Sequence, residues 1–120
     1  MYAEKDIYFI MNIKEYQSKA DLFQILSHPV RLQILDELRK QACCVCHLQV
    51  VTGRPQAYVS QQLRILRDAE FVTDEKDGQN VYYRLCNTTV DFLLRETLGP
   101  TGLPLHQSDC TCPKCVTEKS

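Results

Sequence analysis

The chain lacks an excess of charge of either sign. Its 120 residues include 14 Lys and Arg against 15 Asp and Glu, which gives a formal net charge of −1. This balance argues against a protein coated in positive charge, such as a histone-like DNA condenser. It leaves DNA binding open, because a local patch of Arg and Lys is enough for phosphate contacts. The length and a hydrophobic content of 44% fit one domain with a modest core.

The sequence also lacks a long hydrophobic run. The apolar run at residues 7–11 is short, follows Glu4 and Asp6, and has no small-residue cleavage site, so no signal peptide is predicted. No stretch approaches the roughly 20 apolar residues of a membrane-spanning helix. We therefore expect a cytoplasmic protein with no membrane partner. Clustered cysteines in that compartment indicate metal or redox chemistry rather than a disulfide scaffold.

What the chain does have is seven cysteines, six of them in two tight clusters. The clusters are Cys43, Cys44 and Cys46, and, on a Gly/Pro-rich tail, Cys110, Cys112 and Cys115. Spacing this short favours convergence on a soft metal ion, since thiolates select thiophilic cations. An odd number of thiols could not be used up by a closed set of disulfides. The seventh, Cys86, ends an apolar strand and is predicted to be a buried small side chain.

Hydrophobic periodicity predicts a mainly helical fold with a β-hairpin wing. A short helix, a Gly-containing turn and a longer amphipathic helix form a helix-turn-helix, and Asp77-Gly78 marks the tight turn of the hairpin after it. The predicted helices are 14–26, 30–38, 44–51, 55–69 and 88–98, and the strands are 71–75 and 79–85. We expect an N-terminal extension at 1–13, a winged helix-turn-helix domain for DNA binding and dimerisation at 14–98, and a Cys-rich tail at 99–120.

The helix over 55–69 is the candidate DNA-contacting element. At about 100° per residue its buried stripe is Val59, Leu63 and Leu66. The opposite face carries Ala57, Gln61 and Arg64, with Tyr58 and Ser60 at its edges. Gln and Arg pair with base edges in the major groove, while Ser and Tyr reach phosphates or bases. A solvated face without function is the alternative, and the hairpin directly after the helix favours DNA binding. At the hairpin tip, Lys76 and Asn80 are candidates for contacts to a neighbouring groove or phosphate.

Several stretches, in the correct order, resemble the ArsR/SmtB family of winged-helix metal-sensing repressors. They are Leu-Ser-His-Pro-Val-Arg-Leu-Gln-Ile-Leu at 26–35, Cys-Val-Cys-His-Leu at 44–48, Val-Ser-Gln-Gln-Leu-Arg-Ile-Leu at 59–66, Asp-Gly at 77–78 and Val-Tyr-Tyr-Arg-Leu at 81–85. The resemblance covers about residues 14–98. It implies a homodimer assembled mainly through the first and last helices, repression by binding double-stranded palindromic operator DNA, and release by an inducer. No small organic substrate is expected.

The resemblance also implies residue roles at the DNA. Gln56, Ser60, Gln61 and Gln62 match the recognition-helix motif of the family, which often has the form Ser-x-His-Leu. Gln62 replaces that His, so the base preference cannot be transferred.

For the inducer, Cys44-Val-Cys46 matches the thiolate motif of arsenic-, cadmium- and lead-responsive members. The third cysteine of arsenic-responsive members is replaced by Gln49. The Asp/His ligands expected on the last helix of zinc-responsive members are also missing, which argues against a zinc or nickel site of that kind.

The geometry of the first cluster leaves its ligand pair open. Neighbours in Cys-x-Cys lie about 200° apart on a regular helix, so either the first turn is frayed or Cys43 pairs with Cys46. Two thiolates are incomplete: arsenite takes three, and zinc or cadmium commonly four. The tail thiols Cys110, Cys112 and Cys115 are expected to complete a site for As(III), Cd(II) or Pb(II), with Zn(II) possible. An independent tail zinc site or a reactive tail are the alternatives.

Three hypotheses for function follow. The first is a metal-responsive repressor, and the second is a repressor of the same fold that responds to thiol oxidation or persulfidation. The third, a thiol enzyme using Cys112 and Cys115, ranks last because no scaffold is evident to lower a thiol pKa. Among the histidines, His28 is assigned to a helix boundary and His47 to the neighbourhood of the site without ligation. His106 is kept as a weak ligand candidate.

Overall fold

The computed structural model describes the backbone of residues 2–100 and the side chains from residue 13 onward. This part of the chain forms five helices and three short strands. In order they are α1 (Tyr2–Leu26), α2 (Pro29–Lys40), β1 (Cys43–Cys44), α3 (Val45–Thr52), α4 (Gln56–Asp68), β2 (Val72–Asp77), β3 (Asn80–Leu85) and α5 (Thr88–Leu98). None of the helices described is long and apolar enough to cross a membrane. The predicted winged helix-turn-helix is confirmed.

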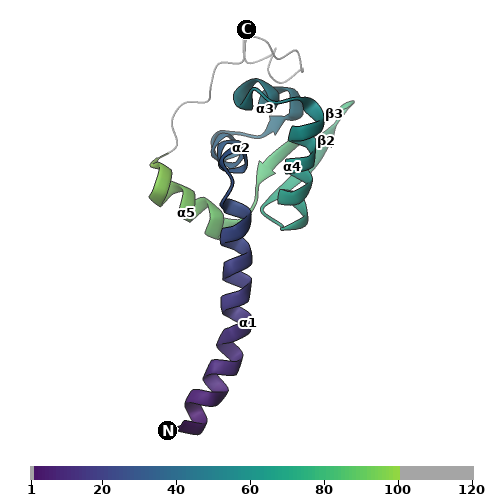
Figure 1. Cartoon of the computed structure of the whole chain (residues 1–120). Coiled ribbons are helices and arrows are strands. Elements are labelled where there is room, and N and C mark those ends of the chain that lie inside the picture. Colours follow the sequence, from purple (N-terminus) through teal and green to yellow (C-terminus); the bar gives the residue numbers. More distant parts are fainter. Residues whose placement is uncertain (1, 101–120) are drawn as a thin grey trace.

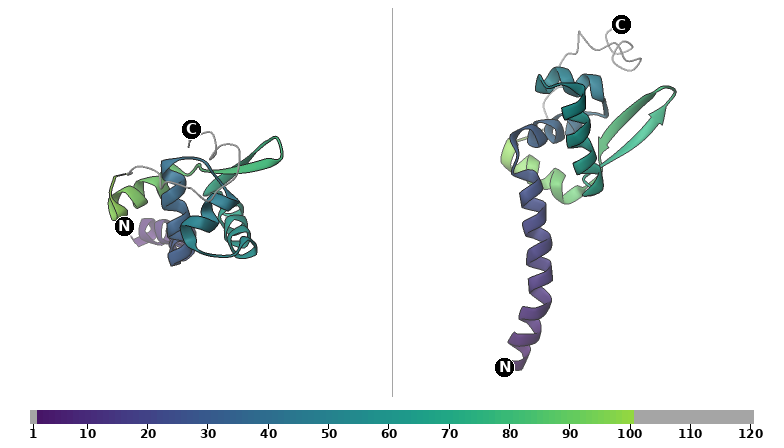
Figure 2. Two further views of the ribbon diagram at one scale, coloured as in Figure 1. Left: turned by 90° about the horizontal axis from the view of Figure 1, so that it is seen from above. Right: turned by 45° about the vertical axis from the view of Figure 1, so that its right-hand side comes forward.

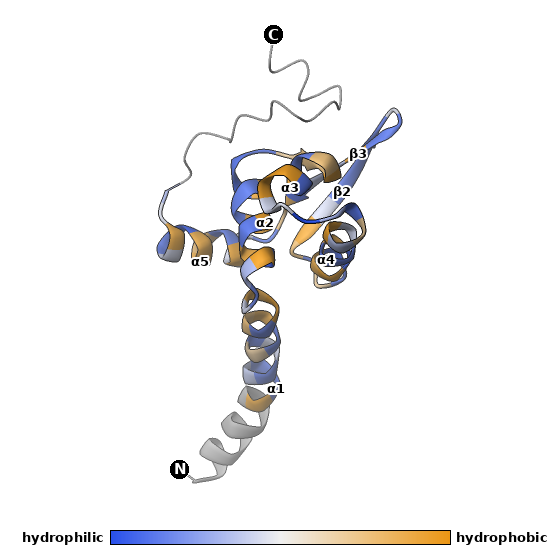
Figure 3. Cartoon of the chain, turned by 45° about the horizontal axis from the view of Figure 1, so that its top comes forward, coloured by the Kyte–Doolittle hydropathy of each residue, from blue (hydrophilic) through white to orange (hydrophobic). Residues whose placement is uncertain are grey.

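The core lies where α2, α3, α4 and α5 meet the inner face of the sheet. α2 occupies the centre of the body, and the hairpin of β2 and β3 projects from one side (Figure 1). The stripe predicted for α4 is fully buried, since Val59, Leu63 and Leu66 are each 0% exposed. Figure 3 shows apolar residues recurring along the helices of the body, whereas the outer part of the hairpin is hydrophilic.

The first helix is longer than the sequence predicted. It begins at Tyr2 instead of residue 14 and leaves the body as a single long helix in Figure 1 and in the right-hand view of Figure 2. It ends at Leu26, and Pro29 opens α2 with His28 as its N-cap. His28 therefore lies at the helix boundary, as predicted, although its side chain forms no capping hydrogen bond.

The sheet contains one strand that the sequence did not predict. β1 pairs antiparallel with β3, with Cys43 opposite Tyr83 and Cys44 opposite Tyr82, so the strand order is β1-β3-β2. Two residues are too few to show an alternating pattern. The strand matters because it, rather than a frayed helix, sets the backbone at the first cysteine cluster.

The hairpin confirms the predicted tight turn. Asp77 pairs with Asn80 in the ladder, and Gly78 in the two-residue loop between them has φ 66°. Glycine takes this left-handed conformation without the steric cost that a Cβ adds.

The prediction that Cys86 is buried is wrong. Its side chain is exposed, and its Sγ lies 3.6 Å from the carbonyl oxygen of Glu70. Tyr83 and Leu85 of β3 pack on the core, so the alternation of side chains along a strand turns Cys86 outward together with exposed Arg84.

Candidate functional site

The first cysteine cluster lies where β1 meets α3. Cys44 is the N-cap of α3 with an extended backbone (φ −83°, ψ 169°), and its Sγ accepts a hydrogen bond from the backbone N–H of His47 at 3.4 Å. The Sγ atoms of Cys44 and Cys46 are 2.9 Å apart. The separation of about 200° between Cys-x-Cys neighbours applies only when both residues are part of a regular helix. Because Cys44 lies outside the helix, its sulfur meets that of Cys46.

Cys43 points elsewhere. Successive side chains of a strand face opposite sides, so Cys43 packs into the main core while Cys44 packs against Tyr82. The Cys43 thiol is 2% exposed and donates to the carbonyl oxygen of Gln41 at 3.3 Å. The structure thus brings together Cys44 and Cys46, and it favours them over Cys43 as the thiol pair.

A buried hydrogen-bonded pair that the sequence analysis missed lies next to the cluster. His47 Nε2 is 3.1 Å from Glu37 Oε1, and these side chains are 1% and 2% exposed. The Nζ of Lys40 is 3.3 Å from the other Glu37 oxygen. Desolvation raises the pKa of Glu37, but hydrogen bonds from His47 and Lys40 outweigh it and hold that pKa below its ordinary value of 4.5. The sequence contains a sign of this pair, because helical spacing places Glu37 on the same buried face of α2 as Ile34 and Leu38. A carboxylate at such a position needs a polar partner.

Replacing Glu37 with Gln is expected to lower the free energy of unfolding by about 1–3 kcal/mol at neutral pH, because hydrogen bonds to a buried charge are lost. The folded pKa is depressed, so the stabilisation is complete above the unfolded value and disappears as pH falls through the folded pKa. Denaturant unfolding across the acidic range measures the difference between the variant and wild type.

The matched control is Glu75→Gln. Glu75 lies 3.8 Å from Arg84 with both side chains mostly exposed, so we expect a change of about 0.5 kcal/mol or less. Parallel pH curves for Glu37→Gln and wild type, with a constant offset down to the lowest pH, would contradict the assignment.

The donors present suit a thiophilic ion but are incomplete. Cys44 and Cys46 supply two sulfurs, the donor type that As(III), Cd(II) and Pb(II) prefer. Among the side chains that the structure describes, residues 13–100, no group of three or more His, Cys, Asp and Glu is arranged to hold a metal. His47 lies beside the pair, as predicted. The tail candidates, His106, Cys110, Cys112 and Cys115, lie outside the described residues.

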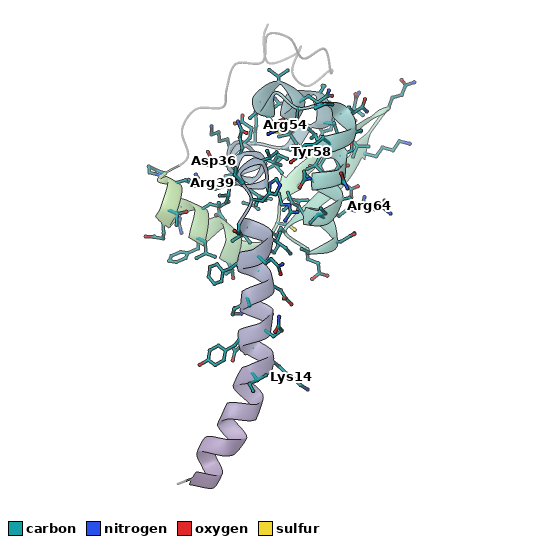
Figure 4. The ribbon with its side chains drawn as sticks, in the orientation of Figure 1. Lys14, Asp36, Arg39, Arg54, Tyr58 and Arg64 are labelled. Atoms are coloured by element: carbon teal, nitrogen blue, oxygen red, sulfur yellow. The ribbon has the colours of Figure 1, made fainter. Side chains whose placement is uncertain are left out.

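The outward face of α4 carries most of the predicted DNA contacts. The side chains on it are exposed, and Figure 4 shows Arg64 directed away from the body. These exposed residues are Gln56, Ala57, Ser60, Gln61 and Arg64. Tyr58 is half-buried, with the Arg54 guanidinium 5.3 Å from its ring centroid.

Gln62 does not lie on this face. Its side chain is only 5% exposed, and its Oε1 accepts a hydrogen bond of 2.8 Å from Nε of Arg31 on α2. The helical periodicity of 55–69 predicts no role for position 62. Gln62 was predicted to contact DNA only because it matches the family motif.

The wing carries several acidic side chains close in sequence to Lys76, the residue predicted to contact DNA. Lys76 is exposed on β2, but the same strand also contains exposed Asp74, Glu75 and Asp77. Arg67 of α4 lies 3.2 Å from Asp74. Arg67, Lys76 and Arg84 are offset by the three acidic side chains of β2, so this part of the wing offers phosphates no net positive patch.

Large apolar side chains remain exposed on the first and last helices. Phe92, for example, is 51% exposed on α5, and Tyr16 is 66% exposed on α1. The others on these helices are Ile13, Phe23 and Leu98. Clustered exposed apolar residues of this size are typical of a protein–protein interface.

Comparison with known sequences identifies relatives. The profile of the ArsR family of bacterial regulatory proteins matches residues 28–74. The arsenical resistance operon repressor of Bacillus subtilis is 36% identical over 99 residues, covering 82% of this chain and 91% of that protein. The transcriptional repressor SmtB homolog of Synechocystis is 38% identical over 87 residues, covering 72% of this chain and 66% of that protein. An SmtB repressor of Mycobacterium tuberculosis is 35% identical and is covered over 61% of its length.

Solved structures agree with this relationship. The transcriptional repressor BigR from Xylella fastidiosa has a TM-score of 0.65 at 31% identity, covering 69% of this chain and 85% of that one. A homodimeric winged helix-turn-helix DNA-binding domain from Mycobacterium bovis has a TM-score of 0.66 at 25% identity, covering 72% of this chain and 81% of that one. Shared fold, motif order and sequence identity lead to one conclusion: the chain belongs to the ArsR family of bacterial regulatory proteins.

Proposed function

We propose that this protein is a dimeric transcriptional repressor that binds operator DNA through α4 and releases it when a thiophilic ion binds Cys44 and Cys46. The observation that carries the proposal is the pair of sulfurs 2.9 Å apart at the start of α3, the helix that leads directly into the recognition helix. Relatives named as repressors, including one of an arsenical resistance operon, support a regulator over a thiol enzyme.

The DNA contact is assigned to the outward face of α4. Gln61 and Arg64 are exposed there and carry the side-chain groups that pair with base edges. Gln56 and Ser60, near the N-terminal end of the helix, are suited to phosphates, with Ala57 small enough to allow close approach. Tyr58 lies at the edge between this face and the one held against His28, and it is a phosphate candidate from that edge. Lys76 is assigned a secondary phosphate contact at most, because the acidic residues of β2 offset the positive charge of the wing.

Dimerisation is assigned to α1 and α5. Their exposed apolar side chains, such as Tyr16 and Phe92, would be buried between two copies of the chain. A two-fold dimer places two α4 helices on one side of the assembly, which matches a palindromic operator with half-sites one helical turn apart. The similar winged helix-turn-helix domain from M. bovis is homodimeric, which supports a dimer but does not identify the helices at its interface.

The link from metal to DNA runs through the short connection between α3 and α4. Gly53 closes α3 in a left-handed conformation (φ 67°), and its N–H bonds the carbonyl oxygen of Gln49 at 2.8 Å. Leu48 of α3 and Leu63 of α4 are fully buried in the same core cluster. A pull on Cys44 and Cys46 that moves α3 would therefore move α4 with it. A coupling of 1–3 kcal/mol, which changes affinity by about 5- to 150-fold, suffices to empty an operator.

The tail is assigned the remaining ligands. Cys110, Cys112 and Cys115 would bring the thiolate number to the three or four that As(III), Cd(II) and Pb(II) accept, and Zn(II) remains possible. An extended chain advances about 3.3 Å per residue, so the tail is long enough to reach α3 of its own subunit or of its partner.

A thiol-redox response is the second candidate. The short distance between the Cys44 and Cys46 sulfurs favours it, because peroxide would convert one thiolate to a sulfenic acid that condenses with the other thiol and releases water.

Operator release by metal tests the proposal. Duplex DNA selected from a randomised library by the reduced protein is titrated anaerobically by fluorescence anisotropy, with arsenite, Cd(II) or Pb(II) added in turn. We expect at least one ion to lower DNA affinity by about 5- to 150-fold. Deleting the residues after Pro104 should remove most of that response and leave DNA binding intact.

Peroxide added in parallel separates the two candidates. Release by peroxide but by none of the ions would favour the redox response, and release by neither would overturn both. An undiminished metal response in the shortened protein would show that the tail is not part of the site.

A further inference from the structure

One guanidinium joins three helices at the corner between α1 and α2. Arg31, in the first turn of α2, donates through Nε to Gln62 Oε1 of α4 at 2.8 Å. Through Nη1 it donates to the carbonyl oxygen of Ile25, in the last turn of α1, at 3.2 Å. The last turn of a helix leaves carbonyl groups without helical partners, so Arg31 binds α1 at a position where the backbone has an acceptor to spare.

A second polar contact lies on the same face of α4. Tyr58 is one turn before Gln62, and its hydroxyl is 3.5 Å from Nε2 of His28, the N-cap of α2. Residues four apart share one face of a helix. This face of α4 is therefore held against the α1–α2 corner, while the DNA-contacting face, with Arg64, points away from the body (Figure 4).

The hydrogen bonds between α4 and the α1–α2 corner restrict the orientation of α4 more closely than apolar packing does. Val59, Leu63 and Leu66 bury one stripe of α4, but apolar burial is non-directional and allows a helix to roll or slide by small amounts. A charge-assisted hydrogen bond from a rigid, planar guanidinium fixes both distance and angle. Gln62 is 5% exposed, so water does not compete freely for its oxygen.

We infer that Arg31 is a positioning residue for DNA recognition, which sets the angle of α4 relative to α1 through Gln62. The inference rests on the proposed function, in which α1 carries part of the dimer interface. The α1–α4 angle then determines the separation of the two recognition helices across the dimer. That separation must match half-sites one turn apart. Gln62, at the position of the family's motif His, acts in the interior of the protein rather than on a base.

The test compares specific with non-specific DNA binding. The probes are the inverted-repeat duplex selected by the wild-type protein, the same duplex with one base pair added at its centre, and a shuffled duplex of equal length. Arg31→Gln is expected to weaken binding to the selected duplex about tenfold and to reduce the preference for the original over the lengthened spacing. Binding to the shuffled duplex should stay unchanged, because it depends on phosphate contacts.

Variants of the partner residue separate positioning from general stability. Gln62→Leu removes the acceptor and should reproduce the effect of Arg31→Gln, whereas Gln62→Glu retains an acceptor for Arg31 and should keep the spacing preference. The double variant Arg31→Gln, Gln62→Leu should be no worse than either single variant. Arg39→Gln, which removes the same charge from the other end of α2, serves as the matched control because Arg39 bonds Asp36 and Gly99 instead.

Wild-type affinity and spacing preference in Arg31→Gln would overturn the inference. The inference would also be overturned if the effects of Arg31→Gln and Gln62→Leu on DNA affinity were additive and Gln62→Leu changed the base preference. Gln62 would then contact DNA directly. If Arg31→Gln fails to fold, Gln62→Leu with wild-type spacing preference overturns the inference by itself. Failure of the wild-type protein to select any duplex would instead remove the proposed function on which the inference rests.

Discussion

Replacing both Cys44 and Cys46 with Ser is expected to abolish release from DNA by arsenite, Cd(II) or Pb(II) while leaving DNA affinity within about twofold of wild type. A serine hydroxyl is a poor ligand for thiophilic ions, so loss of two thiolates should lower metal affinity by more than about a hundredfold. The fold should survive, because Cys44 is the N-cap of α3 and Ser is among the best N-cap residues.

The measurement is an anaerobic absorbance titration of the thiolate-to-metal bands, run beside DNA binding. Cys86→Ser is the matched control, since Cys86 is an exposed thiol just after β3 and outside the first cysteine cluster. Cys43→Ser tests the alternative pairing, and because Cys43 packs into the core we expect some loss of stability with the metal response retained. Normal metal-induced release by the double variant would exclude this cluster as the sensing site.

Gln61→Ala and Arg64→Ala are each expected to lower affinity for the selected operator by about 5- to 150-fold, the effect of losing one good base contact worth about 1–3 kcal/mol. Both side chains are exposed on the outward face of α4, so truncation should leave stability nearly unchanged. Anisotropy titrations against the selected duplex and a shuffled duplex measure the loss of specificity.

Salt dependence separates base contacts from phosphate contacts. If Arg64 contacts a base, specificity falls at one operator position; if it contacts a phosphate, affinity falls for all sequences and the salt slope decreases by about one. Lys14→Ala is the charge-matched control, because Lys14 is exposed on α1 away from α4 (Figure 4). Unchanged operator affinity in both α4 variants would move the DNA contact to another surface.

Local patterns in the sequence were sufficient to predict most elements of the fold, except β1 and the first half of α1. The apolar stripe of α4 and the Asp77-Gly78 turn depend on short-range spacing, and such spacing is fixed by the geometry of a helix or hairpin. The order of these elements, together with the motifs around them, also pointed to the correct family. The same local patterns placed Gln61 and Arg64 on an exposed face.

Other features depend on partners distant in the sequence. β1 exists because Cys43 and Cys44 lie beside Tyr83 and Tyr82 of β3, and no local pattern in two residues encodes that pairing. The extended backbone it imposes at Cys44 is what allows the sulfur to meet Cys46.

Tertiary contacts also decide the surroundings of two single residues, Gln62 and Cys86, for which the sequence predictions were wrong. The motif put Gln62 among the DNA contacts, but Arg31, distant in sequence, holds its side chain in the interior. Cys86 ended an apolar strand and was predicted to be buried, but the core covers only the opposite face of that strand.

By itself, then, the sequence determined the helices, the hairpin, the family and the two groups of thiols, because each is specified by residues close together in the chain. Only the tertiary structure decided which thiols of the first cluster meet, that Glu37 and His47 form a buried pair beside them, and that Arg31 joins α1 to α4. Those features depend on side chains from different helices and strands, whose separation and burial are fixed only once the elements have packed together.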